Sequence, residues 1–458
     1  MIKLEQNYRS TQNILDAANC VIKNNVGRKD KALWTSQKSG EQLHYYRAMT
    51  EHEEAQFIAQ KIKYMIESDG RNYSEFAVLY RTNAQSRVIE EMLIKAGIPY
   101  RIFGGLKFYD RKEIKDIIAY LRLIQNPVDD VSLKRVINVP KRGIGNRTIE
   151  KLEEAANKTG ESLFSVLLDD DLIQGFSRRV IAGIKDFALL ISKYGQNKED
   201  ISVTELIQRV LEESGYMEEL HKENTVEAQG RMENLQEFLS VAMEFERNSE
   251  IKTLEEFLGT ISLVSDLDNM SDDENTVVLM TLHSAKGLEF PVVFLSGLEE
   301  GIFPTSRALT EERDIEEERR LCYVGITRAE EILFLTHAMM RTLYGRTNYN
   351  PMSRFIDEIA DHLIDMNKEE IRKKEKKALA PLPGIYRGKT LEEKPPATNT
   401  GASQEAKPGA KAKHDKFGIG TIISVKKSES GTELTIAFDS AGIKKLLLEY
   451  APIKIVNS

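Results

Sequence analysis

Two apolar runs in the second half of the chain predict buried strands. Five of the six residues in 277–282 are apolar, and all four in 292–295 are. Unbroken apolar runs of this length are typical of strands covered on both faces of a parallel sheet. The connection between them carries His283, Lys286 and Glu289. Open α/β sheets usually bind ligands beyond the carboxyl ends of their strands, so we expect these side chains there.

The N-terminal part shows the same alternation of strands and helices. Apolar spacing of three to four residues predicts helices over 51–67 and 84–96, and Gly97 is a suitable C-cap for the second. Apolar runs predict strands at 76–80 and 100–103. Asn83 follows the first of these strands, so we expect it at a carboxyl end of the sheet as well.

Tyr8 and Arg9 stand ahead of an earlier helix, which the apolar positions in 14–22 predict. Ser10 is a suitable N-cap for this helix. The free amides at a helix start favour phosphate, so Arg9 is a candidate phosphate ligand. A solvated arginine beside a capped helix would give the same local sequence, and these residues alone leave both interpretations open.

From about residue 108 to residue 268 the pattern changes to helices with few strand signals. This change predicts a helical domain inserted into the α/β lobe. Apolar residues recur at helical spacing in 114–123, 133–136, 150–156, 178–194, 203–213 and 232–245.

A glycine-rich basic turn lies inside this helical region. Lys141 and Arg142 precede Gly143 and Gly145, which flank a single isoleucine, and we expect Thr148 to cap the following helix. Glycines let backbone amides approach a phosphate closely, as in a helix-hairpin-helix contact with DNA. A simple tight turn between two helices is the alternative.

The strand pattern resumes at residue 276. A charged helix is predicted over 311–325 and a strand over 332–336. The charged face of that helix is typical of a solvated surface. Arg328 lies where the helix gives way to the strand, and we expect it to face the same edge of the sheet as the strand ends above.

The C-terminal part predicts a linker and a small barrel. Residues 368–416 are rich in proline and lysine and hold too few large apolar residues to order themselves. Four short strands, at 421–427, 433–439, 444–450 and 453–456, predict an SH3- or Tudor-like β-barrel. The predicted fold class is α/β, divided into a lobe (1–107 and 269–367), a helical insertion (108–268), a basic linker (368–416) and a barrel (417–458).

Composition narrows the possible functions. The chain has 458 residues, of which 41% are hydrophobic, and no run approaches the length of a membrane span. Its start lacks a signal-peptide pattern, and Cys20 and Cys322 are its only cysteines, which indicates a cytoplasmic protein without a zinc site. The net charge of -8 means that nucleic acid would have to bind to local basic surfaces.

Four segments together resemble later helicase motifs of the UvrD/Rep/PcrA family of DNA helicases, and its PcrA branch most closely. They are LEQNYRST at 4–11, VLYRTNAQSR at 78–87, TLHSAKGLEF at 281–290 and RRLCYVGITRAEE at 319–331. The likeness covers nearly the whole chain, including the insertion and the barrel. It implies a RecA-like lobe and a role as an ATP-dependent 3′ to 5′ helicase in DNA repair and replication.

The resemblance also implies roles for single residues. Tyr8 would stack on adenine, Arg9 and Arg328 would reach the γ-phosphate as arginine fingers, and Glu289 would accept a ribose hydroxyl. Single-stranded DNA would be contacted by Asn83, His283 and Tyr344, the last at a position where the family usually has a phenylalanine that stacks on a base. The Lys141 to Gly145 turn would hold the duplex at the junction, and the barrel would bind RNA polymerase.

The family's first lobe has no counterpart in this sequence. That lobe holds the phosphate-binding loop, and no GxxxxGK[ST] pattern occurs anywhere in the chain. We therefore expect the protein ligands of Mg²⁺ to lie outside this sequence, and we expect the chain alone not to hydrolyse ATP.

Two other functional classes stay open at this stage. One is a non-catalytic fragment that binds DNA and RNA polymerase. The other is a helicase-nuclease subunit, but the part after Pro408 is too short for a nuclease domain and has no cluster of carboxylates with lysine.

Overall fold

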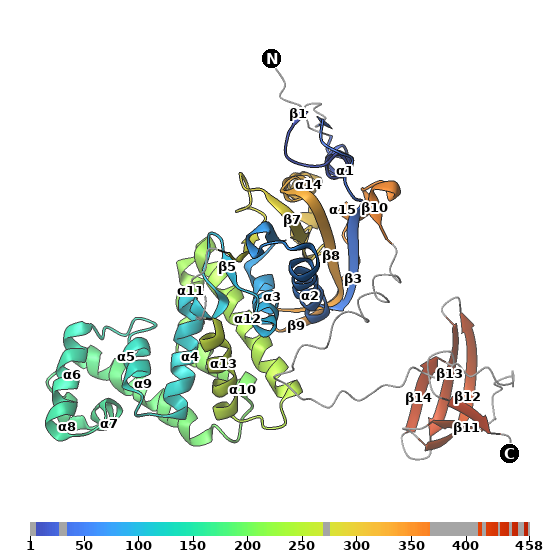
Figure 1. Ribbon diagram of the computed structural model, residues 1–458. Helices are drawn as coiled ribbons and strands as arrows, with labels where there is room; N and C mark the ends of the chain where they lie inside the picture. Colours follow the sequence, from blue (N-terminus) through green and yellow to red (C-terminus); the bar gives the residue numbers. More distant parts are fainter. Residues whose placement is uncertain are drawn as a thin grey trace. The chain divides into compact units, whose positions relative to one another are not determined.

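A computed structural model describes residues 6–26, 34–268, 275–366, 411–414, 418–428, 431–438, 442–447 and 453–456. The chain forms two compact units, 1–386 and 387–458, which are described separately (Figure 1). Among the described residues no helix is both long and apolar enough to cross a membrane. The predicted linker, 368–416, lies outside the described residues except for 411–414.

An eight-stranded sheet forms the centre of the first unit. Its strands run in the order β10, β3, β8, β7, β4, β6, β5, all parallel, and β9 pairs antiparallel with β8. The strands are β3 (Leu43–Thr50), β4 (Phe76–Tyr80), β5 (Tyr100–Ile102), β6 (Val277–Thr281), β7 (Phe290–Leu295), β8 (Ala329–Leu343), β9 (Arg346–Tyr349) and β10 (Ile364–Asp365).

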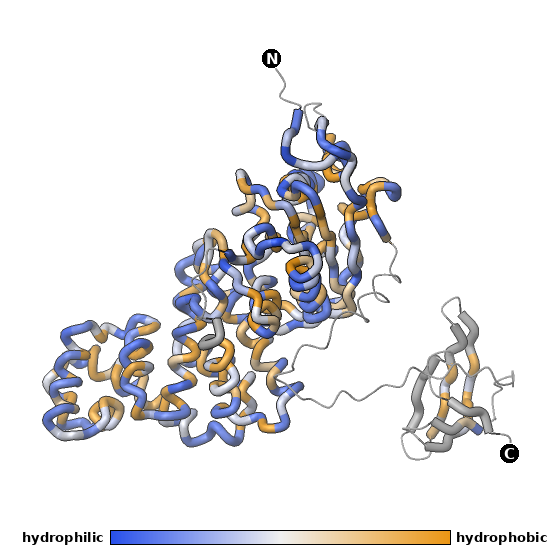
Figure 2. The backbone as a smooth tube through the Cα atoms, viewed as in Figure 1, coloured by the Kyte–Doolittle hydropathy of each residue, from blue (hydrophilic) through white to orange (hydrophobic). Residues whose placement is uncertain are grey.

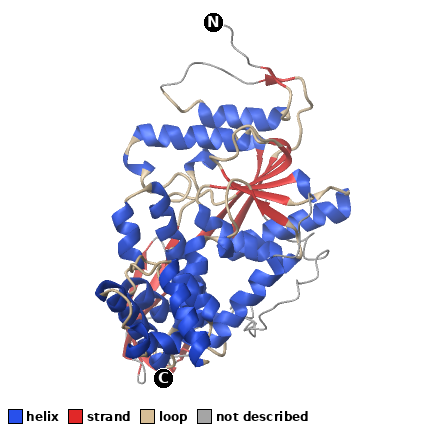
Figure 3. Ribbon diagram, turned by 90° about the vertical axis from the view of Figure 1, so that its left-hand side faces the viewer, coloured by secondary structure: helices blue, strands red, loops and turns tan. Residues whose placement is uncertain are grey.

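Helices cover both faces of this sheet, as Figure 3 shows. One buried core lies under α1 (Gln12–Ile22), α14 (Glu312–Ile326) and α15 (Arg354–Asp357). A second core lies on the opposite face under α2 (Glu51–Asp69) and α3 (Ser86–Ala96). The α/β class and the central strands predicted from the apolar runs are therefore confirmed.

Two predicted details of the lobe are wrong. The N-cap of α1 is Thr11, because the Ser10 hydroxyl instead donates to the Ala329 carbonyl oxygen at 2.7 Å. β8 is much longer than the predicted 332–336, since it begins at Ala329 and continues to Leu343, where its last four residues pair with β9.

The region between β5 and β6 is helical and has its own buried core, which runs from Phe108 to Ile261 (Figure 2). The N-cap of α6 is Gly145 rather than the expected Thr148. The helices are α4 (Lys112–Gln125), α5 (Asp130–Val136), α6 (Asn146–Thr159), α7 (Leu163–Leu168), α8 (Asp170–Ile173), α9 (Arg178–Asn197), α10 (Val203–Glu213), α11 (Tyr216–Glu223), α12 (Val226–Asn248) and α13 (Leu254–Asp268).

The second unit is an antiparallel sheet in the order β14, β13, β12, β11, β15. Its strands are β11 (Lys411–His414), β12 (Gly418–Ser428), β13 (Gly431–Phe438), β14 (Gly442–Leu447) and β15 (Ile453–Val456). β11 was missed by the sequence analysis, which assigned these residues to the linker. Ala412 of β11 is nevertheless fully buried.

Candidate functional site

The sheet places the predicted site residues at opposite ends of its parallel strands. We call the side where the strands end the carboxyl edge and the side where they begin the amino edge. Asn83 and His283 follow β4 and β6, so they lie at the carboxyl edge, as expected. Arg328 immediately precedes β8 and Glu289 immediately precedes β7, which puts both at the amino edge. The expectation that all of these residues share one edge is therefore wrong, because residues 282–289 cross from the end of β6 to the start of β7.

Arg328 is held firmly at the amino edge by backbone acceptors. Its Nη1 donates to the Leu288 carbonyl oxygen at 2.7 Å, and its Nε donates to the Val324 carbonyl oxygen at 3.0 Å. Burial, and then the nearby Arg9 charge, lowers the pKa of the Arg328 guanidinium. Two cations close together in a partly buried place attract an anionic ligand.

Arg9 lies beside Arg328 and forms an ion pair with Glu289. The Asn7 side chain accepts from the backbone amides of Arg9 and Ser10 at 2.7 and 2.9 Å, which fixes the turn that presents Arg9. The structure thus brings together three of the predicted nucleotide-binding residues. Tyr8, the fourth, lies next to them in sequence and is 72% exposed.

This set of side chains fits a nucleotide chemically. Guanidinium groups bind phosphate oxygens, a carboxylate accepts hydrogen bonds from ribose hydroxyls, and an exposed ring can stack on a base. Among the described residues, no group of three or more histidine, cysteine, aspartate or glutamate side chains could hold a metal ion. No catalytic step through Mg²⁺ is therefore assigned to these residues.

At the carboxyl edge His283 is exposed, and it lies near a charge pair that the sequence analysis missed. Arg81 donates from Nε and Nη2 to the Glu318 carboxylate of α14 at 3.0 and 2.7 Å. Partial burial of the ring and the Arg81 charge lower the pKa of His283. Neutral imidazole is thus favoured at this edge, and it can still form hydrogen bonds with DNA.

Tyr344 occupies an unusual backbone position beyond the carboxyl edge. It forms a two-residue hairpin turn with Gly345 between β8 and β9, and both residues have positive φ values, 56° and 74°. Such turns favour asparagine and glycine, because a tyrosine with positive φ carries steric strain. Strained backbone positions of this kind cluster at functional sites, which makes Tyr344 a candidate functional residue.

Helix α12 of the insertion anchors this turn through hydrogen bonds. The amide of Tyr344 donates to Glu237 at 3.1 Å, its hydroxyl donates to Glu233 at 3.3 Å, and the amide of Gly345 donates to Ser240 at 2.8 Å. The half-buried ring of Tyr344 is thus anchored, and burial with the Glu233 charge raises its hydroxyl pKa. The position of Tyr344 therefore depends on the insertion.

A buried ion network strengthens the same junction. Arg87 of α3 donates to Glu237 at 2.8 Å and also lies 3.5 Å from Glu244 of α12. His52 of α2 forms a second link to Glu244, with 2.8 Å between Nε2 and Oε1. Burial raises the pKa of the Glu237 carboxyl, and the charge and hydrogen bond of Arg87 act in the opposite direction. Arg87 thus offsets part of the free-energy cost of burying this carboxylate.

The glycine turn of the insertion has the backbone expected of an anion site. Gly143 has a φ of 77°, and Gly145 caps α6. The Asn138 side chain accepts from the amides of Arg142 and Ile144 at 2.8 and 3.1 Å. Within the described part of the chain the amides of Gly143 and Gly145 donate to no group, so they are free for a ligand.

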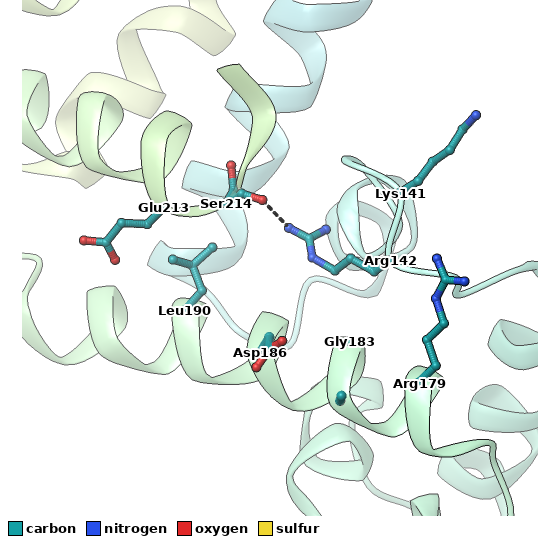
Figure 4. A pocket seen from close by; sticks show the side chains of 9 residues that line it. Lys141, Arg142, Arg179, Gly183, Asp186, Leu190, Glu213 and Ser214 are labelled. Carbon is teal, nitrogen blue, oxygen red and sulfur yellow. Dashed lines mark hydrogen bonds between the residues drawn. The ribbon is translucent and has the colours of Figure 1, made fainter. Parts of the chain in front are cut away.

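The two predicted basic residues of this turn behave differently, as Figure 4 shows. Lys141 is exposed and points away from the helices. Arg142 turns inward, where its guanidinium donates to Tyr120 at 2.8 Å, to Ser214 at 3.2 Å and to carbonyl oxygens of its own loop. Arg142 therefore stabilises the turn, and the structure gives no support for a direct DNA contact from its side chain.

Arg179 is a cation at this turn that the sequence analysis missed. It extends from α9 toward Gly143 and lines a polar cleft of about 440 Å³ together with Lys141 (Figure 4). A β-carbon on Gly183 would lie 2.8 Å from the Arg142 carbonyl oxygen, so this glycine lets α9 approach the turn. Arg179 lies 36 residues beyond Gly143 in sequence. Its position at the turn therefore follows from the packing of α9 and not from any local sequence pattern.

Comparisons with known proteins agree with the resemblance seen in the motifs. Residues 2–339 match the UvrD-like helicase C-terminal domain, and residues 409–454 match the PcrA/UvrD tudor domain. A solved structure of the C-terminal domain of a possible DNA helicase from Lactobacillus has a TM-score of 0.30 and 11% identity over 78% of this chain and 97% of its own, a likeness too weak to carry an argument.

Three similar curated proteins share the same description, ATP-dependent DNA helicase PcrA. The protein from Bacillus subtilis is 50% identical over 99% of this chain and 62% of its own length. Those from Leuconostoc citreum and Staphylococcus aureus are 46% and 45% identical over 100% and 99% of this chain, and over 63% and 62% of their own lengths. The chain thus spans less than two thirds of each relative, and it belongs to the UvrD-like helicase C-terminal domain family.

Proposed function

We propose that this chain supplies the second motor lobe, the DNA-binding insertion and the partner-binding tail of an ATP-dependent 3′ to 5′ DNA helicase. The observation that supports this most strongly is the separation of two sets of side chains. Arg9, Glu289 and Arg328 gather at the amino edge of one sheet, whereas Asn83 and His283 lie at its carboxyl edge. A motor needs a nucleotide site and a DNA site that are distinct but mechanically connected.

At the amino edge each residue has a defined role in the proposal. The guanidinium groups of Arg9 and Arg328 stabilise the negative charge that spreads over the phosphate oxygens in the transition state. Glu289 accepts a ribose hydroxyl, and Tyr8 stacks on the base. The ion pair between Arg9 and Glu289 has to open for both residues to bind the nucleotide.

At the carboxyl edge Asn83, His283 and Tyr344 contact single-stranded DNA. Helix α14 connects this edge to the other: its Glu318 binds Arg81 near His283, and its C-terminal end leads directly to Arg328. From Glu318 to its last residue, Ile326, the helix rises by about 12 Å, at 1.5 Å per residue. A rigid helix of this length can transmit a movement at the phosphates to the DNA contacts.

The insertion and the tail complete the proposal. Lys141, Arg179 and the free amides of Gly143 and Gly145 bind the phosphate backbone of the duplex ahead of the single strand. The antiparallel sheet, which matches the PcrA/UvrD tudor domain, binds a protein partner, for which we propose RNA polymerase. The protein then acts in the cytoplasm, in DNA repair and replication.

The decisive experiment compares this chain alone with a chimera. The chimera joins the part of the Bacillus subtilis protein that the chain does not match to the N-terminus of the chain. We expect DNA-stimulated ATP hydrolysis and 3′ to 5′ unwinding from the chimera but not from the chain, because arginine fingers only accelerate chemistry that other groups set up. ATP hydrolysis by the purified chain, at a rate that Arg328→Ala lowers, would contradict the proposal.

The same pair of measurements addresses the alternative of a non-catalytic fragment that binds DNA and RNA polymerase. If the chimera also fails to hydrolyse ATP although it is folded and binds DNA, the fragment interpretation is the better one. Free amides beside Lys141 and Arg179 give that interpretation a possible DNA contact, but they do not explain the gathering of Arg9, Glu289 and Arg328.

A further inference from the structure

The single tryptophan of the chain lies on an exposed ribbon beside the amino edge. Strand β2 (Trp34–Thr35) pairs in parallel with β1 (Gln6–Asn7), and Trp34 is directly opposite Gln6. The ribbon lies beyond α1 and outside the eight-stranded sheet (Figures 1 and 3). Trp34 is 48% exposed, which is unusual for the largest apolar side chain.

Tyr8 lies at the end of this ribbon, directly after Asn7, the last residue of β1. The Tyr8 hydroxyl donates to the Gln6 side chain at 2.8 Å, which brings the ring back over the residue that pairs with Trp34. Gln6, Tyr8 and Trp34 are all exposed, whereas Asn7 and Thr35 on the other face are half-buried.

Three contacts fix the segment of Trp34 against the segment of Tyr8. Besides the strand pair, the Thr35 amide donates to the Gln12 side chain at 3.3 Å, and the Gln37 side chain donates to the Tyr8 carbonyl oxygen at 3.1 Å. The rings themselves are not in contact with each other among the aromatic pairs of the described residues. Neither ring therefore covers the other.

We propose that Trp34 is a second nucleobase-binding residue, which contacts the base that Tyr8 stacks on, so that the two rings form one aromatic platform at the nucleotide site. The inference rests on the proposed function, and it adds a residue to it. The Tyr8 ring directly precedes Arg9, which pairs with the Glu289 carboxylate and lies beside the Arg328 guanidinium, and Trp34 is joined to this segment through Gln6. Rings beside cations and a carboxylate match the base, phosphates and ribose of a purine nucleotide.

A test needs no added label on the protein. Because Trp34 is the only tryptophan, fluorescence excited at a wavelength that selects tryptophan reports on this position alone. The full chain is titrated with ADP carrying a fluorescent group on its ribose, and energy transfer from Trp34 gives the dissociation constant. Unlabelled ADP should compete and quench the Trp34 emission, whereas inorganic tripolyphosphate should not quench it, because it has charges but no base.

Variants separate the aromatic contact from other effects, with anisotropy of the labelled ADP as the readout. We expect Trp34→Ala to raise the dissociation constant about five- to tenfold and Trp34→Phe, which keeps a ring, to change it less than about threefold. Tyr349→Ala is the matched control, since Tyr349 is an exposed aromatic (79%) on β9, and it should have no effect.

Three outcomes would overturn the inference. If labelled ADP binds and Arg9→Ala weakens it, but Trp34→Ala does not, the proposed nucleotide site stands and the role of Trp34 is wrong. If no ADP binds at all, the inference falls together with the assignment of the amino edge in this chain. If Trp34 emission changes only when the N-terminal part of the Bacillus subtilis protein is added, Trp34 is a protein contact instead.

Discussion

The two edges of the sheet hold their candidate residues in different ways. At the amino edge Arg328 donates to the backbone of its own lobe, at Leu288 and Val324. At the carboxyl edge Tyr344 is anchored to Glu233 and Glu237, which belong to helix α12 of the insertion. Arg328, the proposed arginine finger, is thus positioned locally, whereas Tyr344, a proposed DNA contact, is positioned from another part of the chain.

This difference suggests how the two sites can be tuned separately. A movement of the insertion would displace the residues at the carboxyl edge first, because hydrogen bonds and ion pairs join α12 to Tyr344, Arg87 and His52. It would reach the amino edge only through the sheet and α14. Variants at the amino edge should therefore alter turnover, and variants at the carboxyl edge should alter DNA affinity.

The largest effect is expected at the amino edge. In the chimera, Arg328→Ala should lower kcat about 10³-fold or more, since an arginine finger stabilises the transition state rather than the bound strand. Affinity for single-stranded DNA should stay within a few fold. ATP turnover and fluorescence anisotropy of a labelled oligonucleotide measure the two quantities.

The hydrogen bonds of Arg328 make a control for stability necessary. Arg328→Lys keeps a positive charge but loses the planar fork, so it should also be strongly impaired in kcat. Thermal unfolding of both variants shows whether the lobe remains folded. Normal turnover combined with lost DNA binding would reverse the assignment of the two edges.

A smaller effect is expected at the carboxyl edge, from Tyr344. Base stacking is worth about 1 to 3 kcal/mol, so Tyr344→Asn should weaken binding of single-stranded DNA roughly 5- to 150-fold. Asparagine tolerates positive φ, so the same substitution should leave the hairpin as stable as before or more stable. Equilibrium binding and thermal unfolding of the chain test both parts.

Tyr344→Phe is the matched variant, because it keeps the ring and loses only the hydrogen bond to Glu233. Its DNA affinity should remain within about threefold of the original, if stacking is the main contribution. Equal losses of affinity in the two variants would show that the turn acts through α12 and not through the ring.

The strands and helices of the lobe could be predicted from local patterns, but the grouping of its residues could not. Continuous apolar runs identify β6 and β7 without further information. Whether Glu289 falls at the end of one strand or the start of the next depends on where the crossover of residues 282–289 ends, which the sequence does not show. The local pattern therefore gave the wrong edge for Glu289 and Arg328.

Long-range packing accounts for the other errors. The inward direction of Arg142 depends on Tyr120 and Ser214, which are 22 and 72 residues away. The alternating lysines of β11 are typical of a solvated segment, and its pairing with β12 and β15 makes it a strand. Contacts of this kind come from tertiary structure, which overrides local preference.

A still smaller effect is expected at the glycine turn. Lys141→Ala should reduce the salt dependence of binding to a duplex with a 3′ tail by about 0.9 units of slope, because one phosphate contact is lost. Lys141→Ala with Arg179→Ala should reduce it by about twice as much. The pair Lys141→Ala and Arg142→Ala, which the sequence alone favours, would instead disturb the fold through Arg142.

Two controls make this prediction specific. Lys185→Ala removes a different cation of α9, which pairs with Asp170, and it should leave the slope unchanged. Binding of a short single-stranded oligonucleotide should also be unchanged, since the turn has no aromatic side chain for unpaired bases. Equal losses on both kinds of DNA would assign the turn to the single-strand path or to the fold.

The smallest effect concerns the pH dependence of the junction between α2 and α12. Burial alone would lower the pKa of His52, but the hydrogen bond and charge of Glu244 outweigh it and raise that pKa. The pKa of Glu244 falls to about 2, so this carboxylate stays charged over the useful range. His52 therefore stabilises the fold fully below its unfolded pKa of about 6.5, and this contribution is lost as the pH rises through the folded pKa.

The melting temperature of the chain should fall more between pH 6 and pH 9 than that of His52→Gln, by about 1 to 2 °C, measured by thermal unfolding at several pH values. His44→Gln is the matched control, because His44 lies on β3 and pairs with the exposed Glu41 rather than with the insertion. If His44→Gln changes the pH dependence as much as His52→Gln does, the link between the carboxyl edge and α12 is not the source of the effect.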